Sequence, residues 1–341
     1  MNKPSDQKVR EAIQAIFSIP TVGTGLSNFD IQFKSRVLLH HWSLSRVERL
    51  SFRSDELPSL IFKAVLPPLH NELDIYLDLF QDNRRWTPTL YGSARLNEEV
   101  WLFLEDLGTR TFKSEVTYEN LQRVTNTLAG MHVAFGREVA NGQLQSRSHL
   151  AVRDYPAYIA GARQALVLTR ALVSRNLFPS VTNNHLAKLE AVVSVYDRVA
   201  IGLLGAPQTL VHGDFNPQNI IFDPIPGGER VFIIDWANAY IGAGLIDLVD
   251  LATFASTHFG PDTMPRLLQT YRAAYRVASG EPIATAPLDE LFVCGQIEKK
   301  IGLIRWYAQC SLKWIPTGVQ AYDHMVSGLI EEVYELSTIL V

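Results

Sequence analysis

Three short apolar segments between residues 209 and 251, each bounded by polar residues, constrain the fold of this 341-residue chain most strongly. Asp214 follows the first segment, Asn219 precedes the second, and Asp235 ends the third. Residues 223–230, with two prolines and two glycines, separate the last two segments and predict a tight turn. We therefore expect a hairpin-like return of the chain that brings Asp214, Asn219 and Asp235 to one small space.

The chemistry of these three side chains indicates a hard cation. Two carboxylates and an amide oxygen, without a cluster of His or Cys ligands, suit Mg²⁺, which shares its coordination shell with substrate phosphates. In phosphoryl transfer, one Asp orients the attacking hydroxyl while an Asn and a second Asp hold the metal. The alternative is that each residue only caps a strand or a turn, and for any one of them alone that interpretation is preferred. The order and spacing of the set favour a site.

The motif HGDFNPQN at 212–219, followed by IIDW at 233–236, Gly242 and Asp247-Leu248, resembles the aminoglycoside phosphotransferase family. These are small-molecule kinases similar in fold to protein kinases, whose catalytic loop has the same Asp-to-Asn spacing. The resemblance implies an α+β, protein-kinase-like two-lobe fold. Its N-terminal lobe has an antiparallel sheet plus a helix, and its larger C-terminal lobe is mostly helical.

The resemblance also implies ATP and Mg²⁺ as cofactors and assigns a role to each motif residue. Asp214 is the implied catalytic residue, which accepts or orients the hydroxyl proton. Asn219 and Asp235 are the implied metal ligands. His212 and Asp247 are expected to support the catalytic loop, and for Asp247 this role is preferred to that of a metal ligand.

Residues 36–65 alternate apolar and turn-type stretches and predict a three-stranded antiparallel meander. Lys63 stands inside its third strand, where a lysine is costly unless it has an anionic partner. Glu72 in the next helix is the first candidate and Asp74 the alternative, and without a partner Lys63 would lie on the solvent face of an edge strand. By the resemblance, Lys63 and Glu72 form the ion pair that holds the α- and β-phosphates of ATP.

The apolar segment 100–104 resembles the hinge between two lobes. There the adenine of ATP would bond backbone groups of Leu104, Glu105 and Asp106; the alternative is a core strand followed by a turn. We place the boundary here, with an N-terminal nucleotide-binding lobe at 1–104 and a C-terminal catalytic and acceptor-binding lobe at 105–341.

Two other stretches of the first hundred residues are expected to be loops. Residues 86–93 contain Pro88 and Gly92 and predict loop and turn. Residues 42–46, between the first two strands, occupy the place of a phosphate-covering loop but contain no glycine. Their contacts with phosphate stay unassigned, and Arg46 is one source of positive charge.

From residue 118 onward the chain is predicted to be mainly helical, and in the resembled family such helices commonly shape the acceptor pocket. His132 lies on an apolar stripe and is interpreted as structural. Asp250 is expected on the same helix as Asp247, under weaker constraint. Lys299 and Arg305 are interpreted as solvated charges, with contact to the acceptor as the alternative.

Composition narrows the class of protein. A formal net charge of −4 argues against a nucleic-acid partner. Without a run of about 18 apolar residues no membrane span is expected, and the N-terminus does not resemble a signal peptide. The two cysteines, Cys294 and Cys310, cannot form a disulfide framework or a zinc site alone. We expect a cytoplasmic protein, whose oligomeric state the sequence does not predict.

These features predict an ATP- and Mg²⁺-dependent phosphotransferase that moves the γ-phosphate to a hydroxyl of a small molecule. The acceptor would be an antibiotic, such as an aminoglycoside, or a metabolite, and no dense acidic cluster for an aminoglycoside is found in the helical segments. One alternative is a Mg²⁺-dependent phosphohydrolase, which would not need Lys63 and Glu72. Another is a nucleotide-binding pseudokinase scaffold that has lost catalysis.

Overall fold

The computed structural model describes residues 4–17, 33–53, 57–81, 85–225, 228–281 and 288–340. The chain forms two compact units. Unit 1 comprises residues 1–115, 147–149 and 218–238, and unit 2 comprises residues 116–146, 150–217 and 239–341. The motif at 212–219 is thus divided, because its first six residues belong to unit 2 and its last two to unit 1. The functional division after Leu104 stays a prediction.

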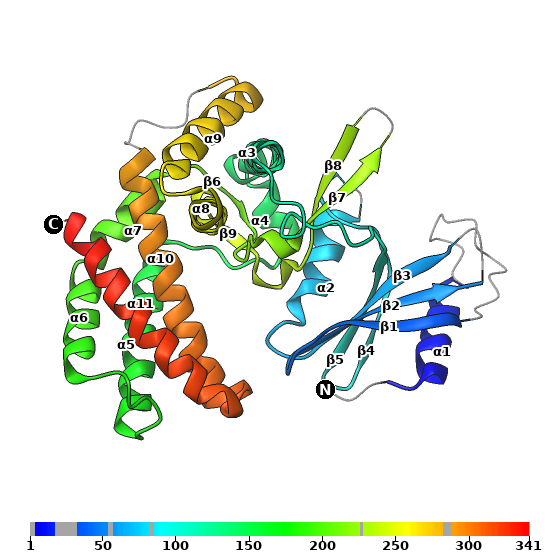
Figure 1. The fold of residues 1–341 in the computed structure, drawn as a ribbon, viewed down its shortest axis with the longest axis horizontal. Helices are drawn as coiled ribbons and strands as arrows, with labels where there is room; N and C mark the ends of the chain where they lie inside the picture. Colours follow the sequence, from blue (N-terminus) through cyan, green and yellow to red (C-terminus); the bar gives the residue numbers. More distant parts are fainter. Residues whose placement is uncertain are drawn as a thin grey trace. The chain divides into compact units, whose positions relative to one another are not determined.

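Unit 1 is built on a five-stranded antiparallel sheet with the strand order β1-β2-β3-β5-β4 (Figure 1). The expected meander is present, since β2 pairs with both β1 and β3. The apolar segment 100–104 lies in β5, which pairs with β3 and β4 in the interior of the sheet. The five strands are β1 (Phe33–His41), β2 (Ser45–Phe52), β3 (Ser59–Val65), β4 (Leu90–Leu96) and β5 (Glu99–Glu105).

Strand β4 corrects the expectation of loop and turn over 86–93. Residues 90–93 pair with β5, and a register shift lies between Leu90 and Gly92. Gly92 marks a close approach, because a β-carbon there would lie 2.4 Å from the Ile16 side chain. A glycine within a strand often marks such an approach of another element, and here it was mistaken for a turn signal.

Helix α1 (Asp6–Phe17) supplies one side of the unit 1 core. Ser5 accepts a hydrogen bond from the Lys8 backbone N–H at 3.3 Å, as expected of a helix cap. The apolar face of the helix is buried and packs with side chains of β2, β3 and β5. The residues of this core include Val9, Ile13, Ile16, Leu50, Leu60, Phe62, Trp101 and Phe103.

Two further elements complete unit 1. Helix α2 (Asn71–Ile75) continues as a π-helical turn, Tyr76–Phe80. Strands β7 (Ile220–Ile225) and β8 (Gly228–Ile233) form the predicted hairpin, with Ile220 opposite Ile233; residues 226–227 of its turn lie outside the described ranges. The Asn71 amide donates to the Ala237 carbonyl at 2.8 Å, so α2 is joined to the segment that follows β8.

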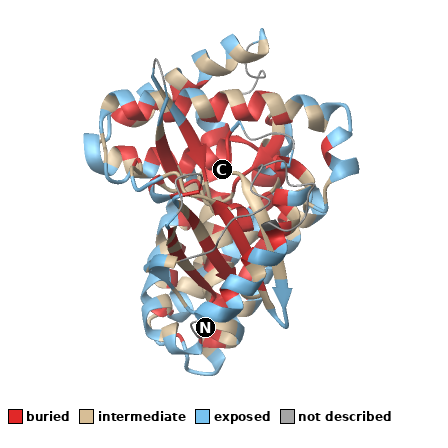
Figure 2. Cartoon of the chain, turned by 90° about the vertical axis from the view of Figure 1, so that its right-hand side faces the viewer, coloured by how far each residue is buried: buried red, intermediate tan, exposed pale blue. Residues whose placement is uncertain are grey.

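Unit 2 is mainly helical, with one short antiparallel pair, β6 (Gln208–Val211) and β9 (Tyr240–Ala243). Figure 2 shows buried residues on the strands and inner helix faces, and exposed residues on the outer faces. The helices are α3 (Tyr118–Ala140), α4 (Gln143–Arg147, its last residue in unit 1), α5 (Tyr155–Ser174), α6 (Asn183–Ser194), α7 (Tyr196–Gly205), α8 (Leu245–Phe259), α9 (Thr263–Ser279), α10 (Leu288–Gln309) and α11 (Val319–Ile339).

Helix α10 is the central helix of unit 2. It packs against α5, α7, α8 and α11, so little of its surface is left for solvent. Buried residues occur at almost every turn of this helix. Across the described ranges, no helix combines the length and the apolar character that crossing a bilayer requires.

Candidate active site

The first group of polar residues surrounds Lys63 on β3. Its side chain is 9% exposed, and its ammonium nitrogen lies 2.6 Å from Glu72 Oε2 and 2.7 Å from Asp235 Oδ1. The expected ion pair between Lys63 and Glu72 is therefore present. The alternative partner, Asp74, instead faces Arg95 at 2.5 Å in an exposed pair.

Electrostatics keep this lysine charged. Burial alone would lower the pKa of Lys63, but Asp235 and Glu72 together raise it above its ordinary value. Burial raises the pKa of the fully buried Glu72, and Lys63 opposes that change. A cation held by two carboxylates on separate elements is fixed in position, as a phosphate-binding lysine requires.

Asp235 and Asn219 meet at the base of the β7–β8 hairpin. The Ile234 backbone N–H donates to the Asn219 carbonyl at 2.9 Å, which places the two neighbouring side chains at the same end of the hairpin. Asp235 has a left-handed backbone, with φ of 68°, a conformation that aspartate tolerates better than most residues and that is found at functional sites. Its side chain is 41% exposed. An amide oxygen beside a partly exposed carboxylate fits Mg²⁺.

The residues expected at the hinge are held by contacts within unit 1. Glu105 accepts from the Thr89 backbone N–H at 3.0 Å and hydroxyl at 2.8 Å, and its own N–H donates to the Thr89 carbonyl at 2.8 Å. Asp106 accepts two hydrogen bonds from Arg49, at 2.6 and 2.9 Å. Burial raises the pKa of Asp106, but bonds from Arg49 and Ser59 outweigh this and lower it. The side chains of Glu105 and Asp106 and the backbone N–H of Glu105 are thus already hydrogen-bonded within unit 1.

Arg46 is also engaged within unit 1. Its Nε donates to the buried Glu48 carboxylate at 2.5 Å, and Arg36 pairs with the same carboxylate. The turn before Arg46 is closed by the Trp42 N–H, which donates to the Ser45 carbonyl at 2.8 Å. The guanidinium of Arg46 is therefore paired with a carboxylate of the same sheet.

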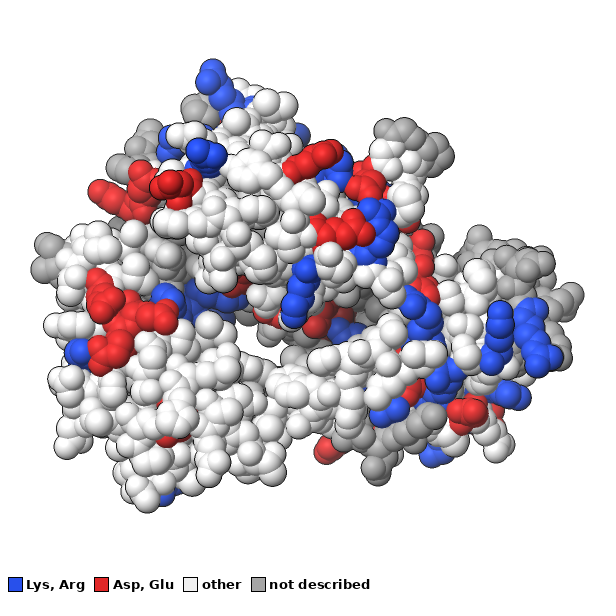
Figure 3. Space-filling view, in the orientation of Figure 1, with Lys and Arg blue, Asp and Glu red and all other residues white. Residues whose placement is uncertain are grey.

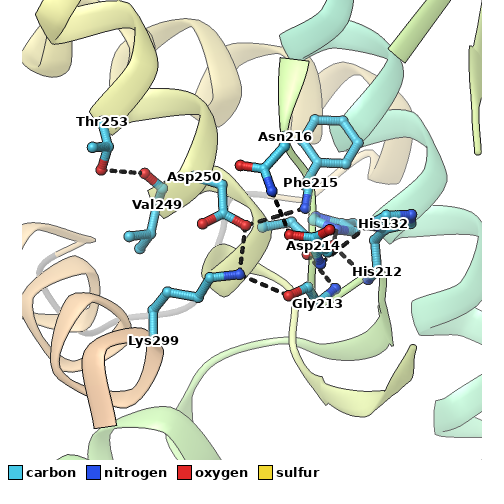
Figure 4. Close-up of polar contacts among 11 residues, drawn as sticks. His132, His212, Gly213, Asp214, Phe215, Asn216, Val249, Asp250, Thr253 and Lys299 are labelled. Atoms are coloured by element: carbon cyan, nitrogen blue, oxygen red, sulfur yellow. Dashed lines mark hydrogen bonds and ion pairs between the residues drawn. The ribbon is translucent and has the colours of Figure 1, made fainter. Parts of the chain in front are cut away.

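The second group of polar residues lies in unit 2 around residues 212–216, which belong to the expected catalytic loop (Figure 4). The Asp247 carboxylate accepts from the backbone N–H groups of His212 at 2.8 Å and Gly213 at 2.9 Å. The Asp214 N–H donates to His212 Nδ1 at 3.2 Å, and the Asn216 amide donates to the Asp214 carboxylate. These are the contacts that the supporting roles of His212 and Asp247 require.

A buried histidine steadies Asp247 in turn. His132 Nε2 lies 3.3 Å from Asp247 Oδ2, and its Nδ1 lies 2.7 Å from the Tyr271 hydroxyl. Burial raises the pKa of Asp247, but His132 and His212 lower it below its ordinary value, so the carboxylate is charged. The interpretation of His132 as a structural residue agrees with these contacts.

Asp250 and Lys299 correct two expectations. Lys299 was interpreted as a solvated charge, but its ammonium donates to Asp250 and to the Gly213 carbonyl, both at 2.7 Å (Figure 4). Asp250 was expected to be weakly constrained, yet it also accepts from the Phe215 N–H at 3.1 Å. Burial raises the pKa of Asp250 to about 6, although Lys299 opposes this. The Lys299 side chain is only 14% exposed, because α10 is packed on several sides.

The sequence-predicted residues therefore fall into two sets. In unit 1, Lys63 contacts both Glu72 and Asp235 directly, and Asn219 adjoins Asp235 through the hairpin; Leu104, Glu105 and Asp106 stand at the end of β5. In unit 2, His212, Asp214 and Asp247 form the catalytic-loop set. Arg49 was not singled out from the sequence, and Asp250 and Lys299 were named with weaker roles than their contacts show. Of the three, only Asp250 had a local signal, as a second carboxylate within an apolar helix.

Comparison with known proteins decides the family. The model of the phosphotransferase enzyme family matches residues 58–287, well over half of the chain. The chain belongs to this family. This confirms the resemblance drawn from the motifs at 212–219 and 233–236, and it makes the chain a small-molecule phosphotransferase.

Solved structures similar to this phosphotransferase agree on its fold. The amicoumacin kinase hAmiN in complex with AMP-PNP, Ca²⁺ and Ami is 12% identical, with a TM-score of 0.55 over 97% of this chain and 96% of that one. The microcompartment-associated aminopropanol kinase is 14% identical, with a TM-score of 0.53 over 92% and 97%. Macrolide 2'-phosphotransferase MphH from Brachybacterium faecium is 15% identical, with a TM-score of 0.53 over 89% and 94%.

These similarities confirm the expected α+β, protein-kinase-like fold of this phosphotransferase. At such low identities they show the fold alone and leave the acceptor open. Among curated protein sequences, the comparison found no significant match.

Proposed function

We propose that this phosphotransferase moves the γ-phosphoryl group of ATP to a hydroxyl group of a small molecule. The observation that carries the proposal is the Lys63 ammonium, which lies within 2.7 Å of carboxylates from α2 and from the segment after β8. A buried lysine held in this way is suited to the α- and β-phosphates of a nucleotide. Glu72 positions Lys63, and backbone groups near Leu104 and Asp106 accept the adenine.

Asp214 is the proposed catalytic residue. It accepts or orients the proton of the acceptor hydroxyl as the hydroxyl oxygen attacks the γ-phosphorus. A new O–P bond forms, the bond from the γ-phosphorus to the bridging oxygen breaks, and ADP leaves with that electron pair. The loop that carries Asp214 is fixed by Asp247, so the carboxylate needs little reorganisation during the reaction.

Asn219 and Asp235 are the proposed ligands of Mg²⁺. Their oxygens fit that ion, and the similar amicoumacin kinase was solved with AMP-PNP and a divalent cation. When bound, Mg²⁺ neutralises charge on the β- and γ-phosphates. The residues of the chain fix where the ligand oxygens lie. Asp235, with its left-handed backbone, directs one carboxylate oxygen toward Lys63.

The Asp214→Asn variant tests the proposal. Turnover, measured as ADP release with a panel of hydroxylated metabolites and antibiotics, should fall by about 10²–10⁴-fold, while Mg-ATP binding stays close to that of the parent. Asp223→Asn, on β7, is the matched control and should retain full activity. Full activity in the Asp214 variant would refute the assignment.

Two further measurements separate this function from its alternatives. A phosphohydrolase would release ADP equally with and without an acceptor, whereas a transferase depends on the added hydroxyl compound. A pseudokinase scaffold would bind Mg-ATP in a thermal-shift titration without any turnover. Asp235→Ala should lose Mg²⁺-dependent nucleotide binding, and an unchanged titration would count against its role as a ligand.

A further inference from the structure

Two arginines of unit 2, near enough for each charge to act on the other, form no ion pair within the described ranges. Arg153 precedes α5, and Arg305 lies on α10. Within the described ranges, neither guanidinium has a carboxylate within 4.0 Å or a hydrogen-bond acceptor, and Arg153 Nε is buried without a partner. The two charges oppose one another, and together with burial this lowers the pKa of Arg305. Guanidinium groups in such surroundings usually have an anionic partner.

One carboxylate of the described residues, that of Glu298, acts on the charges of both arginines. Glu298 is 8% exposed and directly precedes Lys299 on α10. Its carboxylate also accepts a hydrogen bond from the Tyr196 hydroxyl. Arg153 also stacks over the Tyr240 ring, 5.0 Å from its centroid. Two guanidiniums opposite one carboxylate leave a net positive charge among tyrosines.

Gly161 shows that the position of Arg305 is built into the fold. A β-carbon at this buried residue of α5 would lie 2.8 Å from Arg305 Nη1. A glycine within a helix costs about 1 kcal/mol relative to alanine. Here the missing side chain makes room for a guanidinium, which then stays partly exposed.

The arginine pair adjoins the catalytic loop within unit 2. Tyr240, beneath Arg153, is opposite Val211 in the β6–β9 pair, and Val211 immediately precedes His212. Glu298 neighbours Lys299, which donates to the Gly213 carbonyl. An anion bound by the arginines would therefore lie beside the loop that carries Asp214.

We infer that Arg153 and Arg305 bind an oxyanion, a carboxylate or a phosphate, carried by the acceptor molecule. This inference rests on the proposed function only in calling the bound molecule an acceptor. The anion site itself rests on the contacts of Arg153 and Arg305 described above. It favours an anionic hydroxy compound over a polycationic acceptor. On the face shown in Figure 3, acidic side chains among the described residues form small groups interspersed with basic ones, rather than a broad acidic field.

Calorimetric titration of the full chain, in buffer without phosphate or sulfate, tests the site with glycerate, glycerol 3-phosphate and uncharged glycerol. We expect at least one anion to bind and glycerol not to bind. Binding of glycerate alone, of glycerol 3-phosphate alone or of both would identify the preferred oxyanion. Failure of both anions to bind, or equal binding of glycerol, would overturn the inference.

Three variants locate the binding. Arg305→Gln and Gly161→Ala should each raise the Kd of the anion at least tenfold, whereas Arg272→Gln, an exposed arginine of α9, should leave it unchanged. Gly161→Ala keeps every charge and improves helix propensity, and a thermal melt that matches the parent would show that its effect does not arise from unfolding. An unchanged Kd in both site variants would refute the assignment.

A parallel titration with Mg-ATP separates the two proposals. Anion binding that depends on Arg305, in a chain that neither binds Mg-ATP nor releases ADP, would remove the kinase function and keep the anion site. Acceptor-dependent ADP release with anion binding insensitive to Arg305 and Gly161 would do the reverse.

Discussion

Lys299 and Asp250 form a buried ion pair, 2.7 Å apart, that contacts the catalytic loop on both sides of Asp214. Lys299 donates to the carbonyl of Gly213, and Asp250 accepts from the N–H of Phe215. Since the residues before and after Asp214 are both bonded to this pair, its geometry sets the position of the carboxylate between them.

Lys299→Met should lower kcat by about 10–100-fold, because a small displacement of a reacting group has an effect of this size. The Kd for Mg-ATP should change little, since both groups to which Lys299 donates belong to unit 2, whereas the proposed nucleotide-binding residues belong to unit 1. Steady-state kinetics and nucleotide titration would separate the two effects, and Lys299→Arg should recover part of kcat. The neighbouring Lys300→Met, which loses only a pair with Glu332, is the control. Equal losses in the two Met variants would contradict a positioning role.

Titration of Asp250 should give the pH profile of kcat an acidic limb. Its pKa is raised to about 6, so below that pH it is protonated and no longer an anionic partner for Lys299. We expect kcat to rise through about pH 6 and Asp250→Asn to lack that rise. The folded-state pKa lies above the ordinary 3.8, so the folded chain takes up this proton first. Protonated Asp250 therefore stabilises the folded state below about pH 4, and this stabilisation is lost as the pH rises through about 6. The free energy of unfolding falls by roughly 3 kcal/mol at most over that range. A kcat limb that persists in Asp250→Asn would assign it to another group.

Glu72→Gln should weaken Mg-ATP binding about tenfold, because a neutral amide no longer fixes the charge of Lys63 opposite Asp235. Thermal-shift titration with Mg-ATP measures this change. Asp74→Asn removes the neighbouring exposed pair with Arg95 and should alter the Kd by less than twofold. If the two variants bound nucleotide equally well, the ion pair would have no part in nucleotide binding.

Asp247→Ala should destabilise unit 2 by about 2–6 kcal/mol, since it leaves the buried N–H groups of His212 and Gly213 without acceptors and each such group costs about 1–3 kcal/mol. Urea unfolding of the full chain, followed by near-UV circular dichroism, would show the shift. Asp262→Ala, at an exposed position before α9, should change the unfolding free energy by less than about 0.5 kcal/mol. A similar midpoint for both variants would exclude the bracing role.

Those parts of the fold that follow from local patterning could be predicted from the sequence. The β7–β8 hairpin was readable because turn residues separate two apolar runs. The pair of Lys63 and Glu72 was readable because a lysine in an apolar strand requires an acidic partner. Strand β4 could not be predicted in this way, because Gly92 allows a close approach of the Ile16 side chain that no local pattern reveals.

Contacts between distant segments were beyond prediction for the same reason. Lys299 stands on a helix whose sequence also fits a partly solvated element, and only the packing of α5, α7, α8 and α11 around that helix shows that this charge is largely enclosed. Arg49 and Asp106 are 57 residues apart, and their register across the sheet joins them. A charge in a helix is thus interpretable only once its neighbours are known.

The anchoring of the catalytic loop on Asp247 bears on how the enzyme would fail on heating. Both oxygens of that side chain are bonded to the loop, and the helix that carries it, α8, has Leu248, Leu251 and Ala252 in its buried face. Loosening of the loop would break both bonds and leave buried N–H groups without acceptors. We therefore expect this loop to keep its geometry until unit 2 melts, so that loosening of the loop alone would not inactivate an otherwise folded protein.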